Sequence, residues 1–224
     1  MTSPVVRRRR IAAAAIALLV LAAATALALG ALGSDEPPAT GAARLAPQDT
    51  LVYVHVSTDT GRDAVERADD LLGRFDSYER ITDAILQRLV GTSEEVEASD
   101  VEPWLGDEAA LALVDAGQAT AGSLVIVRVT DTRRARDFLT KSPKRTAVRT
   151  YKGDRIDEFG TVNVAFKDGW LLIGQPITVQ GALERANGRD RSLADDPTFR
   201  RAMEGAPEGR AADAYVTAGG LRRL

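Results

Sequence analysis

His55 is the only histidine of this 224-residue chain, and therefore the only imidazole that could act as a general base. It lies within Leu51 to Ser57, a stretch rich in β-branched and aromatic residues that predicts a strand. On that strand His55 shares a face with Leu51 and Tyr53. A catalytic triad needs a serine and an aspartate at defined positions around the imidazole, and spacing alone identifies neither. We therefore predict a half-buried structural histidine and assign it no catalytic role.

Paired carboxylates could supply acid–base chemistry or bind a hard cation. Three of the adjacent acidic pairs in the chain are candidates: Asp69 with Asp70, Asp157 with Glu158, and Asp195 with Asp196. Neighbours in sequence point in different directions on a helix or a strand, which argues against a shared site. The third pair precedes Pro197, which favours a helix cap. We predict no catalytic residue among these carboxylates.

Other chemical signatures are absent from the sequence. The segment Asp59 to Asp63 superficially resembles a calcium loop but lacks the alternating acidic positions and the final glutamate. The chain has no phosphate-binding glycine motif, and it has no cysteine for nucleophilic, iron–sulfur or thiolate-zinc chemistry. Trp104 and Trp170 fit core or hairpin positions better than sugar-stacking platforms. We predict no catalytic, cofactor-binding or metal-binding residues, no cofactor, and no enzymatic activity.

The elements that position these side chains alternate between helices and hairpins. Helices are expected over 65–75 and 78–89, after Asp131 or Thr132, from Pro176 to Asn187, and after Asp196. Strands are expected at Leu51–Ser57, Ala109–Asp115, Leu124–Thr130, Thr146–Tyr151, Arg155–Phe159, Val162–Phe166, Trp170–Ile173 and Ala212–Thr217. Asp168-Gly169 is a hairpin signal between two of them. Without a steady βαβ rhythm, the fold class is α+β, with an antiparallel or mixed sheet and helices packed on one face.

The N-terminal segment predicts a membrane anchor. Residues 11–33 carry no charge and directly follow four arginines, Arg7 to Arg10. As a helix, 19 to 23 such residues cover roughly 28 to 35 Å, the thickness of the hydrocarbon core of a bilayer. The arginines make residues 1–10 cytoplasmic, so the C-terminal part faces outward. We expect a single-pass transmembrane helix that contacts the lipid bilayer through residues 11–33.

A cleaved signal peptide is the competing interpretation of the same segment. Such peptides also begin with basic residues and end with small ones, and Ala26-Leu27-Ala28 offers a cleavage site. Their apolar region, however, normally runs about 7 to 15 residues, which is shorter than here.

The remaining chain divides into a linker at 34–46 and a single extracytoplasmic domain at 47–224.

Charge is strongly segregated although the formal net charge is only −3. Residues 92–127 carry eight acidic and no basic side chains, whereas residues 128–155 carry ten basic and three acidic ones. One interpretation is two solvated faces that partly neutralise one another. The other is a basic surface that meets anionic headgroups or an acidic polymer. The arginines at 133, 134 and 136 lack interleaved aromatics and nucleic acid is implausible outside the cytoplasm, so no nucleic-acid partner is expected.

Five short segments, in their order after the anchor, carry a family resemblance. They are Leu45–Val54, Trp104–Leu113, Tyr151–Gly153, Asp168–Gly174 and Ser192–Phe199. Together they resemble the bacterial membrane-anchored family catalogued as domain of unknown function 3352. The resemblance implies an extracytoplasmic protein without an established activity, so it assigns no site residues. Members of the family usually extend beyond 224 residues, so this chain resembles a short or truncated member, and an exposed sheet edge near Ala214 to Ala218 is expected.

Two functions stay open at this point. The first is a non-enzymatic, single-pass protein whose outward domain binds an envelope protein or an anionic surface. The alternative is an envelope hydrolase or small-ligand-binding enzyme whose site is assembled from residues distant in sequence. A deep pocket that gathers His55 with two carboxylates would favour the alternative, and a flat basic face would favour binding.

Overall fold

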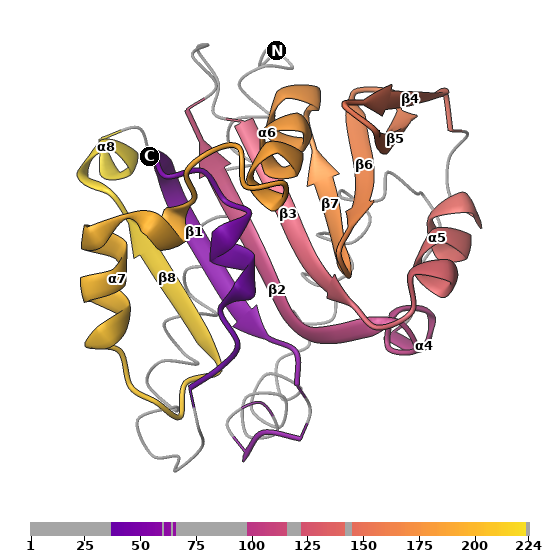
Figure 1. Cartoon of the computed structure of the whole chain (residues 1–224). Helices are drawn as coiled ribbons and strands as arrows, with labels where there is room; N and C mark the ends of the chain where they lie inside the picture. The colour runs from indigo at the N-terminus through magenta and orange to yellow at the C-terminus, as the bar shows by residue number, and fades with distance from the viewer. Residues whose placement is uncertain are drawn as a thin grey trace, which may run out of the picture.

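The protein folds around one antiparallel sheet, seen in a computed structural model that describes residues 37–59, 61–63, 65, 98–115, 122–141 and 145–222. Within these residues, eight strands pair in the order β4-β5-β6-β7-β3-β2-β1-β8 (Figure 1). The strands are β1 (Thr50–Ser57), β2 (Leu105–Val114), β3 (Gly122–Val129), β4 (Ala147–Tyr151), β5 (Asp154–Phe159), β6 (Val162–Lys167), β7 (Trp170–Gly174) and β8 (Ala212–Val216). Every neighbouring pair is antiparallel, so the α+β class is confirmed and the sheet is antiparallel rather than mixed.

Two tight turns set the hairpins on the β4 side of the sheet. Lys152 and Gly153 have φ of 48° and 97° between β4 and β5, and Asp168 and Gly169 have φ of 49° and 80° between β6 and β7. Two successive positive φ values define the type I′ turn, whose twist matches that of antiparallel strands. The hairpin predicted from Asp168-Gly169 is confirmed.

Helices cover both faces of the sheet. The helical segments are η1 (Gly41–Arg44), α4 (Ala98–Val101), α5 (Thr132–Lys141), α6 (Pro176–Ala186), η2 (Leu193–Asp195), α7 (Pro197–Glu204) and α8 (Ala218–Leu221). Val179 and Leu183 of α6 pack with Ile126 of β3, while Ala135 of α5 packs with Val125 of the same strand. Figure 1 shows α6 crossing in front of the sheet. The prediction of helices on one face is wrong, because β3 and β7 alternate large apolar residues on both faces and each face must be covered.

The predicted helix starts are confirmed by their caps. The carboxylate of Asp131 accepts hydrogen bonds from the amides of Arg133 and Arg134 at the start of α5. Asp196 accepts from two amides of the first turn of α7. Both caps satisfy amides that have no partner inside their own helix.

The folded domain begins earlier than predicted. Ala42, Ala43, Leu45 and Ala46 are all at most 5% exposed and belong to the main core, so the expectation of a linker over 34–46 is wrong for this stretch. Small residues let η1 lie close to the sheet: a Cβ on Gly41 would come within 2.8 Å of Cζ2 of Trp170. The alanine and glycine content that resembles a linker is here a requirement of close packing.

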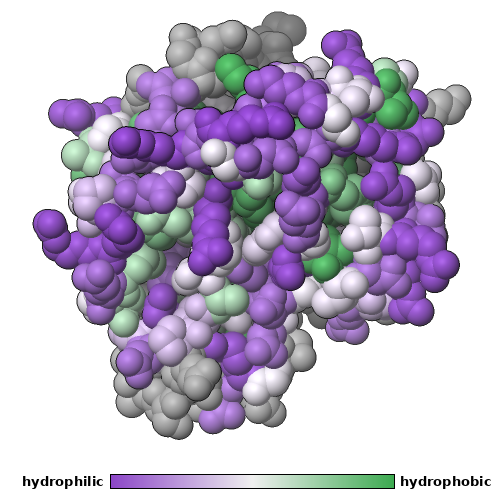
Figure 2. All heavy atoms as spheres, viewed as in Figure 1, coloured by the Kyte–Doolittle hydropathy of each residue, from purple (hydrophilic) through white to green (hydrophobic). Residues whose placement is uncertain are grey.

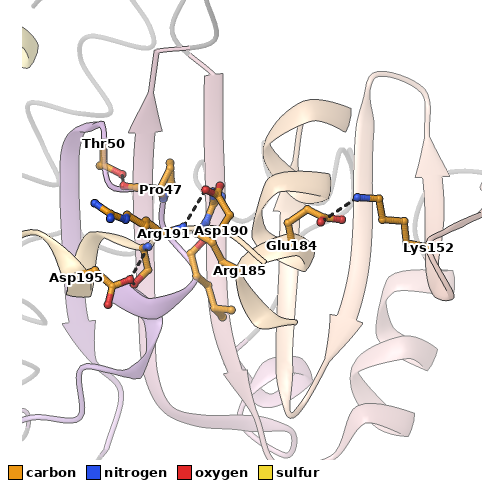
Figure 3. A network of polar contacts seen from close by, with 10 residues as sticks. Pro47, Thr50, Lys152, Glu184, Arg185, Asp190, Arg191 and Asp195 are labelled. Atoms are coloured by element: carbon orange, nitrogen blue, oxygen red, sulfur yellow. Dashed lines mark hydrogen bonds and ion pairs between the residues drawn. The ribbon is translucent and has the colours of Figure 1, made fainter. Parts of the chain in front are cut away.

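Arg185 fastens the same segment to α6. Its Nε donates to the carbonyl of Leu45 at 2.7 Å, and its Nη1 lies 3.0 Å from Oδ2 of Asp190, just after the helix (Figure 3). Burial lowers the pKa of the Arg185 guanidinium, and the carboxylate of Asp190 opposes that shift. A buried guanidinium therefore joins segments that lie far apart in the sequence.

Several predicted elements lie outside the described residues. These are the anchor at 11–33, the cytoplasmic segment at 1–10, the helix at 78–89, and all of the helix at 65–75 except Val65. Among the helices that the structure does describe, none has the length and apolar character needed to cross a membrane. The anchor stays a prediction from sequence.

Candidate functional site: a buried histidine and an arginine cluster

His55 lies between two carboxylates inside the sheet. On β1 it pairs directly with Asp213 of β8, and its Nδ1 is 3.2 Å from Oδ2 of that residue. Its Nε2 is 3.4 Å from Oε1 of Glu108, on the neighbouring strand β2. His55 is 1% exposed and the two acids are 1% and 3% exposed, so the predicted half-buried histidine is in fact fully enclosed.

Glu108 connects this histidine to the N-terminal segment. Its Oε2 accepts from the amide of Gly41 at 2.9 Å and its Oε1 from the amide of Ala42 at 2.7 Å, at the start of η1. Burial raises the pKa of the Glu108 carboxyl, while these two amides and His55 act in the opposite direction. Charge-assisted hydrogen bonds of this length are about twice as strong as neutral ones. The carboxylate therefore holds η1 against the sheet.

Asp213 is balanced by a buried arginine. The Nε of Arg210 donates to Oδ1 of Asp213, and its Nη1 donates to the carbonyl of Pro207 at 2.9 Å. Arg210 is 4% exposed. On the same face, burial and the charges of Glu108 and Asp213 raise the pKa of Tyr53 well above its ordinary value. Its buried hydroxyl has no hydrogen-bond partner within the described part of the chain.

The ring nitrogens of His55 lie beside buried carboxylates and do not reach the surface. A general base needs one ring nitrogen directed at the proton that it removes. Here both nitrogens of His55 face carboxylate oxygens, and the imidazole is closed off from solvent. A deep pocket that gathers His55 with two carboxylates would favour an enzyme. His55 does lie beside two carboxylates, but all three side chains are enclosed.

A cavity of about 370 Å³ lies elsewhere, between the outer strands and α6. Its walls are Arg149, Thr150, Tyr151, Ile156, Glu158, Gly160, Asn163, Pro176 and Gln180. Nε of Arg149 is 2.6 Å from Oε1 of Glu158, so the main charges at this cavity neutralise each other. The volume is at the lower end of ligand pockets, about 300 to 1,000 Å³.

An arginine cluster on the opposite face surrounds a single carboxylate. Asp157 on β5 is 5% exposed. Its oxygens lie 3.1 Å from Nη1 of Arg136, 3.4 Å from Nη1 of Arg145 and 2.8 Å from Nη2 of Arg155. The guanidinium of Arg136 also lies 4.6 Å from the ring centre of Phe166. Arg136 is therefore turned toward the sheet.

The predicted carboxylate pairs do not form shared sites. On β5, Asp157 meets the arginine cluster, whereas Glu158 pairs with Arg149. The other described pair caps helices, because Asp195 accepts from Ser192 and Asp196 accepts from the start of α7. Asp69 and Asp70 lie outside the described residues. Among the residues that the structure describes, no three histidine or acidic side chains are grouped to hold a metal ion.

Hydrophilic residues cover most of the face that carries α6 and α7. Figure 2 shows the hydrophobic residues of this face in small separate areas. The described large apolar side chains with the greatest exposure are Leu221 at 71%, Ile177 at 61%, Val148 at 48% and Val216 at 37%. Single exposed apolar residues of this kind are ordinary on a soluble surface.

The family described as "Protein of unknown function (DUF3352)" matches residues 11–222 of this chain. No curated protein sequence matches this chain. Among solved structures, crystal forms III, I and IV of a protein named TP0453 are similar, with TM-scores of 0.45, 0.49 and 0.45 and identities of 13%, 10% and 12%. They cover 80%, 82% and 83% of this chain, which spans 64%, 65% and 66% of theirs.

Proposed function

This chain belongs to the DUF3352 family, and from this premise we propose that it is a single-pass membrane protein whose extracytoplasmic domain is a non-enzymatic binding module of the cell envelope. The placement rests on the sequence. An uncharged segment at 11–33 follows four arginines, which is typical of an anchor with a cytoplasmic N-terminus and an outward C-terminal domain.

The enclosure of His55 is the observation that carries the binding role. The only imidazole of the chain has both nitrogens within 3.4 Å of buried carboxylate oxygens and is closed off from solvent, so we assign it a supporting role in the fold. In contrast, the arginines around Asp157 combine excess positive charge with partial exposure to solvent. Accessible charge of one sign steers and positions a partner of the other sign.

Crosslinking on intact cells tests the binding role. A membrane-impermeant amine-reactive crosslinker would be applied to cells that produce the tagged chain, which is then purified under denaturing conditions. The proposal expects discrete crosslinked species, and Lys152, which is more than half exposed and pairs with Glu184, supplies one surface amine for the reaction. Recovery of bulk background alone, equal to that of an unrelated anchored domain, would count against it.

Small-ligand binding is the second candidate function, favoured by the cavity beside α6. Its lining mixes apolar side chains with an amide, Asn163, that is 4% exposed. Replacing Gln180, which lines the cavity from α6, by tryptophan would place a large ring in this space. If the cavity holds a ligand, that variant loses the ligand-induced rise in melting temperature that a metabolite library gives with the wild type. If no compound stabilises the wild type, this candidate fails.

A further inference from the structure

The arginine cluster holds more positive charge than its carboxylate can balance. Arg136, Arg145 and Arg155 all direct guanidinium nitrogens at Asp157, which leaves two uncompensated positive charges among the four residues. Other buried or half-buried acids of the described chain have fewer arginine partners. Arg149 meets Glu158, and Arg210 meets Asp213, one to one. The ratio of three to one sets this group apart from a simple structural ion pair.

The guanidinium groups are accessible and already positioned. The side chains of Arg136, Arg145 and Arg155 are 35%, 41% and 49% exposed, while the side chain of Asp157 beneath them is 7% exposed. They come from three places in the chain: α5, the segment before β4, and β5. The guanidinium of Arg136 lies over the ring of Phe166. Asp157 accepts hydrogen bonds from both Nε and Nη2 of Arg155. Groups held in place before binding lose less conformational entropy when a ligand arrives.

We propose that Arg136, Arg145 and Arg155 form a binding site for a phosphate-type oxyanion, carried by a lipid headgroup or by a soluble phosphate compound. The planar fork of a guanidinium matches the oxygens of a phosphate and can bind two of them at once. Two uncompensated positive charges match a phosphomonoester, which carries about −1.5 to −2 at neutral pH, or two neighbouring phosphodiesters. This inference rests on the proposed function and names its ligand class.

Titration calorimetry on the full chain in a neutral detergent tests the site. One arm uses inorganic phosphate. The other uses detergent micelles doped with phosphatidylglycerol, with phosphatidylcholine as the zwitterionic control. Binding in the phosphate arm identifies a soluble source, and binding to phosphatidylglycerol but not phosphatidylcholine identifies a lipid source. Both results support the shared chemistry, and binding in neither arm overturns it.

Matched variants separate the site from general charge. The double variant Arg145→Gln with Arg155→Gln is expected to weaken binding about 25-fold, at about fivefold for each basic residue near an anionic surface. Arg200→Gln with Arg201→Gln removes the same charge from exposed positions on α7 and is expected to change the affinity less than twofold. Equal weakening in both pairs would overturn the proposal.

The variant Asp157→Asn is expected to change the affinity for the anion in the opposite direction. It removes the internal counter-charge and leaves three uncompensated arginines, so the affinity should rise about fivefold if these side chains bind the anion. If the cluster were only structural, loss of its central acid would scatter the arginines and lower the affinity, which would contradict the site. Should this variant not fold, the arginine variants still decide the question.

The crosslinking experiment distinguishes failure of this inference from failure of the proposed function. If the arginine double variant binds phosphate and phosphatidylglycerol as the wild type does, the oxyanion site is wrong. The proposed function would still hold if the wild type yields discrete crosslinked partners on intact cells. If the double variant loses oxyanion binding as expected, the site stands whether or not a protein partner is recovered.

Discussion

Replacing Glu108 by alanine removes the carboxylate that joins η1, His55 and the sheet. Two amide donors, at Gly41 and Ala42, lose charge-assisted hydrogen bonds of 2.9 and 2.7 Å, each worth about 1.5 to 3 kcal/mol. The imidazole 3.4 Å away loses a neighbouring acid. Breaking a buried pair by removing one partner costs about 3 to 5 kcal/mol. Because these contributions overlap, we expect the free energy of unfolding to fall by about 3 to 5 kcal/mol in total.

Urea unfolding of the full chain in mild detergent, followed by tryptophan fluorescence, measures this change. Trp170 packs beside Gly41 and reports on the same region. Glu108→Gln keeps one acceptor oxygen, so it should fall between the wild type and Glu108→Ala. Glu102→Ala, at an exposed position, should change the free energy by less than about 0.5 kcal/mol. If Glu108→Ala is no more destabilising than Glu102→Ala, the argument that this carboxylate holds η1 is wrong.

Three further predictions concern the same core. Gly41→Ala should destabilise by about 1 to 3 kcal/mol in urea, because its Cβ would meet Trp170 at 2.8 Å, whereas Gly205→Ala, with its nearest atom at 3.8 Å, should be neutral; equal effects would contradict the close packing of η1. Tyr53→Phe should not destabilise and should raise the free energy of unfolding by up to about 1.5 kcal/mol, since its hydroxyl is buried without a described partner; a large loss in urea would reveal one. Burial raises the pKa of Glu108, so the folded state binds this proton more readily than the unfolded state, and the extra stability that comes from protonation is lost as pH rises through the folded-state pKa. Urea unfolding at pH 7 and pH 5 should therefore show that the wild type gains stability relative to Glu108→Gln as the pH falls. The same difference in free energy of unfolding at both pH values would contradict this prediction.

Local signals predicted the secondary structure well. Asp131 and Asp196 open helices where the sequence places them, and Asp168-Gly169 forms a hairpin turn. These features depend on side chains and backbone amides only a few residues apart, so they can be inferred from a single sequence. The faces covered by helices depend on how strands pair, and that information is not local.

The partners of His55 could not be inferred for the same reason. Asp213 and Glu108 meet it only because β8 and β2 flank β1, and strand order was not derivable from the sequence. One signal was present. The predicted strand began at Ala109, whereas β2 begins at Leu105 and includes Glu108 on the same face as Ala110. An acid that continues an apolar alternation is a reasonable candidate for a buried charge.

The arginine cluster was predicted only as an excess of basic residues over 128–155. Their sequence did not reveal that Arg136, Arg145 and Arg155 meet at one acid. Asp157 has an adjacent acid, Glu158, and the sequence predicted that the two side chains point in different directions. The pleat of β5 does send them to opposite faces, but the basic partners of each come from other segments and could not be inferred.

The placement of the domain outside the cytoplasm is the claim on which the functional account depends most. Membrane fractionation with intact-mass measurement, combined with protease treatment of whole cells, tests it directly. The account predicts a full-length protein that stays with the membrane and whose domain is cut by external protease. A soluble product that begins near Leu29 or Ala31 would contradict the tether, and a full-length chain protected from protease in intact cells would contradict the outward orientation.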